Sequence, residues 1–159
     1  MTENFFEERK SIKQVEESTD FAPKFGSDGL IPVVTTDFES GELLMQGYMN
    51  KEAFTQTIKL GEAVYYSRSR NSLWHKGKKS GFKQIIKEIR IDDDQDSIWL
   101  RVNVNGGASC HVGYRSCFYR SVPFGNNINS SKLILEFKEK KKVFDPKKIY
   151  GKEPTPTKL

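Results

Sequence analysis

The chain has 159 residues and a formal net charge of +5, and it contains two cysteines. This length is typical of one domain that can bury a real core, and the 12% aromatic and 36% hydrophobic content excludes a disordered chain. Two cysteines are also too few for a disulfide scaffold.

The N-terminal residues MTENFFEERKSIKQVEES are charged and contain no apolar run. We therefore expect no signal peptide, no membrane span and a reducing cytoplasmic setting, in which a structural disulfide is disfavoured. The basic residues cluster at the other end, in KEKKKVFDPKKIYGKEPTPTKL, which indicates a solvated or weakly interacting tail. Because no basic region with interleaved aromatic residues matches a known recognition motif, a nucleic-acid partner is not expected.

Residues 1–27 are predicted to form an N-terminal arm with a short helix. Next, IPVVTTDFESGELLMQGYMN predicts two strands joined by a turn at residues 39–41. NKEAFTQTIKLG predicts a short helix, which Asn50 caps and Gly61 ends. The segments AVYYSRSR and LWHK predict two further strands around a turn at Asn71.

Two later segments alternate between apolar and polar residues, which is typical of half-buried strands. We expect their apolar faces to be formed by Ile85, Ile89 and Ile91 in KQIIKEIRI, and by Ile98, Leu100, Val102 and Val104 in SIWLRVNV. The sequence therefore predicts an α+β fold that is mainly β. It predicts a single compact domain over residues 28–138 with one or two short helices, followed by a basic tail over residues 139–159.

The connection between these two strands, DDDQD, concentrates negative charge in five residues. In an extended chain alternate side chains point to one side, so Asp92, Asp94 and Asp96 would converge and Asp93 would point away. Three convergent carboxylates suit a hard cation such as Mg²⁺. The alternative is an exposed polar turn without an ion, in which aspartate is common.

The segment SCHVGYRSC holds both cysteines and one of the two histidines. Cys110 and Cys117 are a pair of buried packing thiols in one interpretation. In the other, two thiols and the nearby imidazole of His111 are ligand types that Zn²⁺ accepts, and a catalytic zinc needs about three protein ligands. With only two cysteines in the chain, the remaining ligand would be a histidine, an aspartate or a glutamate.

Three segments in combination resemble phosphoribosyl-AMP cyclohydrolase, an enzyme family of histidine biosynthesis. They are YYSRSRNSLWHKGKKSG at residues 65–81, IKEIRIDDDQD at residues 86–96 and GASCHVGYRSCFYR at residues 107–120. GELLMQGYMNKEAF, at residues 41–54, is similar to the early segment of the family. The resemblance covers roughly residues 30–120 and is specific because the segments occur together.

The resemblance implies a homodimeric hydrolase that depends on zinc and magnesium. It adds water to phosphoribosyl-AMP and opens the six-membered ring of the purine at the N1–C6 bond. The zinc is shared between subunits. The metal ligands of the family fall at Asp92, Asp94 and Asp96 for magnesium, and at Cys110, Cys117 and position 93 for zinc.

Position 93 is the main departure, because the family has a cysteine there and this chain has Asp93. A carboxylate can bind Zn²⁺, although it is a harder ligand than a thiolate. We expect Asp93 to complete the zinc set, with His111 as the alternative. Two further departures leave the exact substrate open, since the usual glutamate is Lys78 and the usual asparagine is Phe82.

The substrate carries phosphates, so we expect basic residues in the matched segments to bind it. Arg68 and Arg70 would share one face of a strand, where guanidinium groups suit phosphate oxygens, unless they are a plain surface pair. Lys76 is a further candidate phosphate contact. Trp74 is expected either to stack on a base or to pack in the core.

Three other residues are candidates from the same match. His111 is the candidate general base, and its alternative is a structural histidine bonded to the backbone. Ser80 and Gln84 match the family pattern as substrate-binding residues, whereas His75 is expected to be an exposed strand residue. Two other functions remain open: a diverged paralogue that acts on another purine-like nucleotide, and a non-catalytic domain that binds metal or nucleotide.

Overall fold

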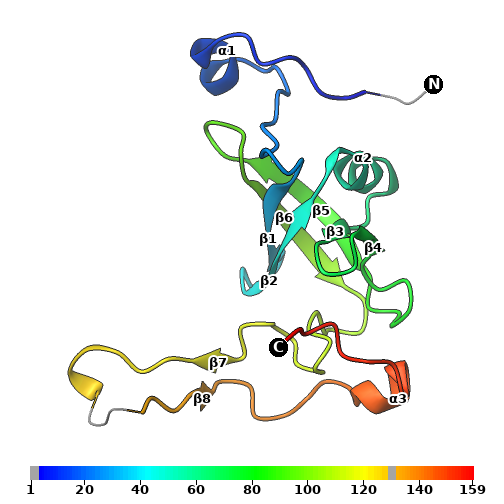
Figure 1. Ribbon diagram of the computed structural model, residues 1–159, viewed down its shortest axis with the longest axis vertical. Coiled ribbons are helices and arrows are strands. Elements are labelled where there is room, and N and C mark those ends of the chain that lie inside the picture. The colour runs from blue at the N-terminus through cyan, green and yellow to red at the C-terminus, as the bar shows by residue number, and fades with distance from the viewer. Residues whose placement is uncertain (1–3, 129–131) are drawn as a thin grey trace.

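The computed structural model describes residues 4–128 and 132–159 (Figure 1). Its elements in chain order are α1 (Ile12–Glu17), β1 (Ile31–Asp37), β2 (Leu43–Met49), α2 (Lys51–Leu60), β3 (Val64–Ser67), β4 (Ser72–His75), β5 (Gln84–Ile91), β6 (Ile98–Val104), β7 (Arg120–Ser121), a 3₁₀ turn (Gly125–Asn127), β8 (Glu136–Phe137) and α3 (Pro146–Tyr150). The predicted mainly β, α+β domain is confirmed. Of the three short α-helices in the described residues, α2 lies in the predicted domain, which agrees with the expected one or two short helices, whereas α1 lies in the predicted arm and α3 in the predicted tail.

A four-stranded sheet in the order β2-β1-β6-β5 forms the centre of the molecule. β1 pairs antiparallel with β2 and parallel with β6, and β5 pairs antiparallel with β6. β3 and β4 form a separate antiparallel hairpin, which follows α2 along the chain. The predicted strands on both sides of the turns at residues 39–41 and at Asn71 are confirmed.

The helix α2 begins and ends where its capping residues predict. The Asn50 side chain accepts a hydrogen bond from the Ala53 N–H at 2.8 Å, which satisfies a free donor of the first turn. Gly61 follows the last turn with φ +66°, a left-handed conformation that suits glycine. The helix turns Phe54 inward, and this ring has no exposed surface.

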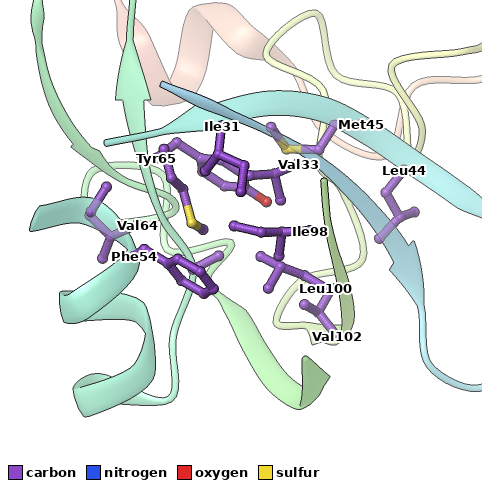
Figure 2. Packing of buried hydrophobic residues seen from close by; sticks show 13 residues of the cluster. Ile31, Val33, Leu44, Met45, Phe54, Val64, Tyr65, Ile98, Leu100 and Val102 are labelled. Carbon is purple, nitrogen blue, oxygen red and sulfur yellow. The ribbon is translucent and has the colours of Figure 1, made fainter. Parts of the chain in front are cut away.

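The core lies between the central sheet, α2 and the β3–β4 hairpin (Figure 2). Alternate residues of β1 and β6 supply one layer of it, as the period of two predicts. In β6 the buried residues are Ile98, Leu100 and Val102, and in β1 they include Ile31 and Val33. These buried side chains join the central sheet to α2 and the β3–β4 hairpin.

One predicted strand face is wrong, because β5 contains a bulge. Ile89 lies opposite Leu100, but Ile85 lies opposite Asn103 on the other side of the sheet. The register shifts between Ile86 and Glu88, so Ile86 takes the core-facing position opposite Val102. An extra residue in one strand reverses the alternation beyond it.

The N-terminal arm packs against the domain through aromatic side chains. The ring of Phe6 lies 5.3 Å from Phe21 and 5.6 Å from Phe54 of α2, between ring centroids. Phe21 also meets Phe54 edge-on at 5.4 Å. The division of the chain into arm, domain and tail stays a prediction, but these contacts fasten the arm to α2.

The C-terminal part consists of a thin ribbon and a returning segment. β7 and β8 pair in a ribbon that extends away from the central sheet (Figure 1). The segment after β8 returns to the domain, where the Val143 N–H donates to the Gly113 carbonyl at 2.7 Å. The helix α3, which Asp145 caps, lies within residues 139–159, the segment predicted to be a solvated tail. In the described part of the chain, each helix is too short or too polar to cross a membrane.

Candidate metal and substrate site

The acidic connection is a tight turn rather than an extended strand. The Asp92 carboxylate accepts hydrogen bonds from the Asp96 N–H at 2.9 Å and the Ser97 N–H at 3.1 Å, and Gln95 has a left-handed φ of +55°. The turn still gathers three carboxylates. One oxygen each from Asp92, Asp94 and Asp96 lies within 4.8 Å of the others.

This arrangement of carboxylates changes the acidity of the turn. The hydrogen bond with Asp94, together with burial and the nearby Asp92, raises the pKa of Asp96 to about 6. Like charges at this distance disfavour a second ionisation unless a cation compensates them. The donor set is oxygen only and reaches solvent, which fits a hard cation such as Mg²⁺. Asp93 is exposed and does not belong to this cluster.

The cysteine segment forms a closed loop that brings its two thiols together. The Cys110 N–H donates to the Tyr114 carbonyl at 3.2 Å, and the Gly113 N–H donates back to the Cys110 carbonyl at 3.0 Å. The Cys117 N–H then joins the start of β2 by donating to the Leu44 carbonyl at 2.7 Å. Cys110 is buried and Cys117 exposed, and both are free thiols.

The two thiols interact, and this interaction separates their acidities. The Cys117 thiol lowers the pKa of Cys110 to about 6, with support from the backbone around Val112 and the Lys76 ammonium. The same interaction, together with burial, raises the pKa of Cys117. One thiolate is therefore available near neutral pH, which is the form that binds Zn²⁺.

Lys76 and His111 complete this end of the molecule. Lys76 is 6% exposed, and its ammonium donates to the Ser109 carbonyl, next to Cys110. Burial, with a further contribution from Lys76, lowers the pKa of His111, so its ring is neutral at pH 7. His111 Nε2 lies 3.3 Å from the Thr155 hydroxyl of the C-terminal segment. Because the Lys76 ammonium points into the protein, it reaches a substrate phosphate only after rearrangement.

Gln84 has no exposed surface, so the structure gives it a supporting position. Its Nε2 donates to the Ser109 hydroxyl at 3.2 Å, and its Oε1 accepts from the Tyr65 hydroxyl at 2.6 Å. Tyr65 in turn shares a hydrogen bond with the Thr35 hydroxyl at 2.7 Å. This buried chain holds the residue that precedes Cys110. Ser80 lies in the loop after β4, where its hydroxyl accepts from the Phe82 N–H at 3.2 Å.

Arg68 and Arg70 lie in the turn between β3 and β4, so the prediction that they share a strand face is wrong. Both are exposed. The Arg68 guanidinium lies 4.1 Å from the centre of the Tyr48 ring, and that of Arg70 lies 5.4 Å from the Trp74 ring. Trp74 itself packs on the edge of the core.

His75 differs from its expected exposed position. It is half-buried in β4, where its Nε2 lies 2.6 Å from a Glu62 carboxylate oxygen. Phe82, one of the departures from the family pattern, packs on Phe144 of the C-terminal segment at 4.7 Å between ring centroids. Phe82 also fills the space that a side chain at Gly106 would need. Packing of the C-terminal segment therefore accounts for this departure.

Glu139, which no sequence motif indicated, shapes the cysteine loop. Its carboxylate accepts from the backbone N–H groups of Arg115 at 2.8 Å and Ser116 at 2.9 Å. Ser116 directly precedes Cys117. The available signal was a single acidic residue inside the lysine run KEKKK, which sequence analysis assigned to a solvated tail.

The acidic turn and the cysteine loop lie at opposite ends of β6 (Figure 1). Its seven residues span roughly 20 Å, since a strand rises about 3.3 Å per residue. In residues 4–128 and 132–159, the aspartate cluster is the only group of three or more histidine, cysteine or acidic side chains close enough to share an ion. Within one chain, Asp93 and the cysteine pair are therefore too far apart to bind one zinc ion.

Comparison with known proteins assigns the chain to a family. The family model described as phosphoribosyl-AMP cyclohydrolase matches residues 45–119. A phosphoribosyl-AMP cyclohydrolase of Rhodopseudomonas palustris strain HaA2 is 47% identical over 142 residues, which are 89% of this chain and 94% of the relative. This chain belongs to the phosphoribosyl-AMP cyclohydrolase family. The resemblance inferred from sequence is thereby confirmed.

Two further relatives of the same name extend the match. The protein of Sinorhizobium fredii strain NBRC 101917 / NGR234 is 46% identical over 154 residues, which are 96% of this chain and 99% of the relative. That of Rhizobium etli strain CIAT 652 is 48% identical over 139 residues, which are 87% of this chain and 90% of the relative. The similarity to this family therefore includes much of the N-terminal arm and the C-terminal segment.

Proposed function

We propose that this chain is a phosphoribosyl-AMP cyclohydrolase of histidine biosynthesis, which adds water to the purine ring and opens its N1–C6 bond. The observation that carries the proposal is 47% identity to a relative of that name across 94% of the relative's length. The thiol pair, the neutral histidine beside it and the carboxylate cluster all lie in the segments that carry the resemblance.

The proposed zinc site uses Cys110 and Cys117 of one subunit and Asp93 of a second copy of the chain. It is supported by two interacting thiols, of which Cys110 has a pKa lowered to about 6. The length of β6 is the reason that the third ligand has to come from another copy. A zinc ion held by these groups supplies the Lewis acidity that activates water for addition to a ring carbon.

His111 is the proposed general base. Its lowered pKa leaves the imidazole neutral at pH 7, so it can accept a proton. As the oxygen of water bonds to C6, His111 takes a proton from that water. The N1–C6 bond then breaks, and His111 returns the proton to the departing N1.

The proposed magnesium site consists of Asp92, Asp94 and Asp96. These carboxylates reach solvent, so an ion bound there can also contact phosphate oxygens of the substrate. The exposed guanidinium groups of Arg68 and Arg70 are proposed to bind phosphates of the substrate. Trp74 is partly exposed and is the proposed residue for stacking on a base through its ring face.

The proposed assembly is a homodimer in the cytoplasm. Besides the zinc argument, it is supported by the exposed apolar side chains of the β7–β8 ribbon. Among the described residues of the segment 118–137, these are Phe118, Val122, Phe124, Ile128, Leu133, Ile134, Leu135 and Phe137. A row of exposed apolar side chains on a projecting ribbon is typical of an interface.

The second candidate function is a diverged paralogue that acts on another purine-like nucleotide. The observations that favour it are the aspartate at position 93 and the exposed Lys78 in place of an acidic residue. The first replaces a soft ligand by a harder one, and the second reverses a charge near the proposed ligands. The third candidate, a domain without catalysis, would keep the fold but bind nucleotide or metal without turnover.

A substrate comparison separates these functions. Purified protein is incubated with Zn²⁺, Mg²⁺ and phosphoribosyl-AMP. Parallel samples contain AMP, which has no substituent at N1, or a different N1-substituted purine nucleotide. Mass spectrometry is expected to detect a product that has gained one water from phosphoribosyl-AMP but not from AMP. Cys117→Ser is the inactive comparison and Gln56→Met, on α2, the control. Turnover of a different purine alone supports the paralogue, and no turnover of any supports the non-catalytic domain.

A further inference from the structure

Gln95 lies between Asp94 and Asp96, but its side chain points into the protein. It is 5% exposed, and its amide bonds three backbone groups of the N-terminal arm. Nε2 donates to the Val15 carbonyl at 2.9 Å and the Asp20 carbonyl at 3.1 Å, and Oε1 accepts from the Ala22 N–H at 2.9 Å. The amide of Gln95 is therefore a clamp on the arm and is not directed at a ligand.

The backbone of Gln95 joins the arm and the acidic turn as well. Its carbonyl accepts from the Lys24 N–H at 2.7 Å, and its own N–H donates to the Asp92 carbonyl at 3.1 Å, which closes the turn. A left-handed backbone is disfavoured for a residue other than glycine. The hydrogen bonds to the arm compensate for this conformation, and the conformation in turn shapes the turn.

The backbone groups of the arm that bond Gln95 depend on this residue for their hydrogen bonds. Ala22 has no exposed surface, so its N–H would lose a partner in a buried position if Gln95 were replaced. Arg9 supports the same stretch, because its Nη1 donates to the Ala22 carbonyl at 2.6 Å. Arg9 and Glu16 of the arm also line a cleft with Asp94, so the arm forms a wall beside one carboxylate of the cluster.

We infer that Gln95 is a positioning residue that makes docking of the N-terminal arm a condition for the carboxylate geometry of the magnesium site. The inference rests on the proposed function, which assigns Mg²⁺ to Asp92, Asp94 and Asp96. Since coupling between two equilibria is reciprocal, a bound cation tightens the arm, and loss of arm contacts weakens cation binding. The arm is then a working part of the enzyme.

The test measures binding of Mn²⁺ to the full-length protein. The electron paramagnetic resonance signal of free Mn²⁺ reports how much of the ion is bound. Gln95→Met keeps the side-chain length and removes the amide. It is expected to raise the Mn²⁺ dissociation constant about 10- to 100-fold, as is usual for residues that support metal ligands. Phe21→Ala removes the ring that packs on Phe6 and Phe54, so it loosens the arm and is expected to act in the same direction. Gln56→Met, on α2, is the matched control and is expected to bind normally.

Two further readouts separate positioning from loss of folding. Hydrogen exchange in the parent protein is expected to slow at Ala22 when Mg²⁺ is added, and this effect is expected to vanish in Gln95→Met. Excess Mg²⁺ is expected to restore the turnover of Gln95→Met with an unchanged KM for the nucleotide. If Gln95→Met does not fold, Phe21→Ala and the exchange of the parent protein decide the question.

The possible failures are distinguishable. Normal Mn²⁺ binding in both Gln95→Met and Phe21→Ala, alongside weak binding in Asp94→Asn, overturns the inference and leaves the magnesium site in place. A rate of hydrogen exchange at Ala22 that does not change when Mg²⁺ is added to the parent protein also overturns the inference. Mn²⁺ binding that is unchanged in Asp94→Asn overturns the magnesium site itself.

Discussion

Cys110 and Cys117 form an interacting pair of free thiols at the two ends of the loop that connects them. This pairing and the buried ammonium of Lys76 lower the pKa of Cys110 to about 6. The chain therefore holds a preformed thiolate at one end of the central sheet, where Gln84 and Glu139 support the surrounding backbone.

The first prediction concerns this thiolate in metal-free protein. The ultraviolet absorbance of the thiolate is expected to rise with a midpoint near pH 6, the pKa of Cys110. Lys76→Met removes a positive charge that favours the thiolate, so the midpoint is expected to move to higher pH. Lys79→Met, on an exposed lysine nearby in sequence, is the control. An identical midpoint in Lys76→Met would show that Lys76 does not act on the thiol.

The second prediction concerns Asp93. If its carboxylate completes the zinc set, Asp93→Cys tightens zinc binding, because a thiolate is the softer ligand. Asp93→Ala is expected to loosen it, and Cys110→Ser is expected to abolish it almost completely. Zinc retention against a series of chelators measures all three. If Asp93→Ala retains zinc as well as the parent protein, His111 or water fills that position instead.

The third prediction concerns the assembly. Light scattering is expected to give a homodimer. Mixtures of inactive Asp93→Ala with inactive Cys117→Ser are expected to recover activity, because each mixed dimer rebuilds one complete zinc site from two chains. The separate variants are the controls. A fully active monomer, or mixtures that stay inactive despite subunit exchange, would contradict a shared site.

The fourth prediction concerns the pH dependence of cation binding at the acidic turn. The pKa of Asp96 is raised to about 6, so a proton competes with the cation below that pH. Mn²⁺ affinity is expected to be full above about pH 6 and to fall as the pH drops through it. Asp92→Asn removes one source of the shift, so its weaker binding is expected to depend less on pH. A flat profile in the parent protein would argue against the carboxylate cluster as the cation site.

The fifth prediction concerns the buried hydrogen-bond chain below Ser109. Tyr65→Phe removes the hydroxyl that joins Thr35 to Gln84, so the Thr35 hydroxyl and Gln84 Oε1 lose this buried partner. We expect the free energy of unfolding to fall by about 1–3 kcal/mol in urea. Tyr66→Phe, on the next and partly exposed residue, is expected to change it by less than about 0.5 kcal/mol. Equal effects of the two substitutions would contradict a special role for the buried chain.

The period-two pattern was sufficient to predict β6 and its core-facing side chains, because side chains of a strand alternate regardless of distant contacts. The same rule failed in β5, where the bulge at residues 86–88 places Ile85 on the opposite face. It also failed for Arg68 and Arg70, which lie in a turn. Local composition does not reveal these features, because they depend on how neighbouring strands fit together.

The candidate site shows the same limit. The sequence indicated which residues carry metal-binding chemistry, since carboxylates and thiols are recognisable by type. It did not reveal that Gln95 clamps the arm, that Gln84 is buried or that Glu139 holds the cysteine loop. These roles are set by contacts across many residues, such as the 73 positions that separate Ala22 from Gln95.

The most direct test removes zinc from purified protein with increasing chelator and then adds Zn²⁺ back. Zinc content and turnover of phosphoribosyl-AMP are measured in the same samples at each step. The account predicts that turnover falls in proportion to bound zinc and returns when zinc is restored, with Mg²⁺ present throughout. Full turnover in samples that have lost all zinc would contradict it, as would zinc-loaded protein that leaves phosphoribosyl-AMP unchanged.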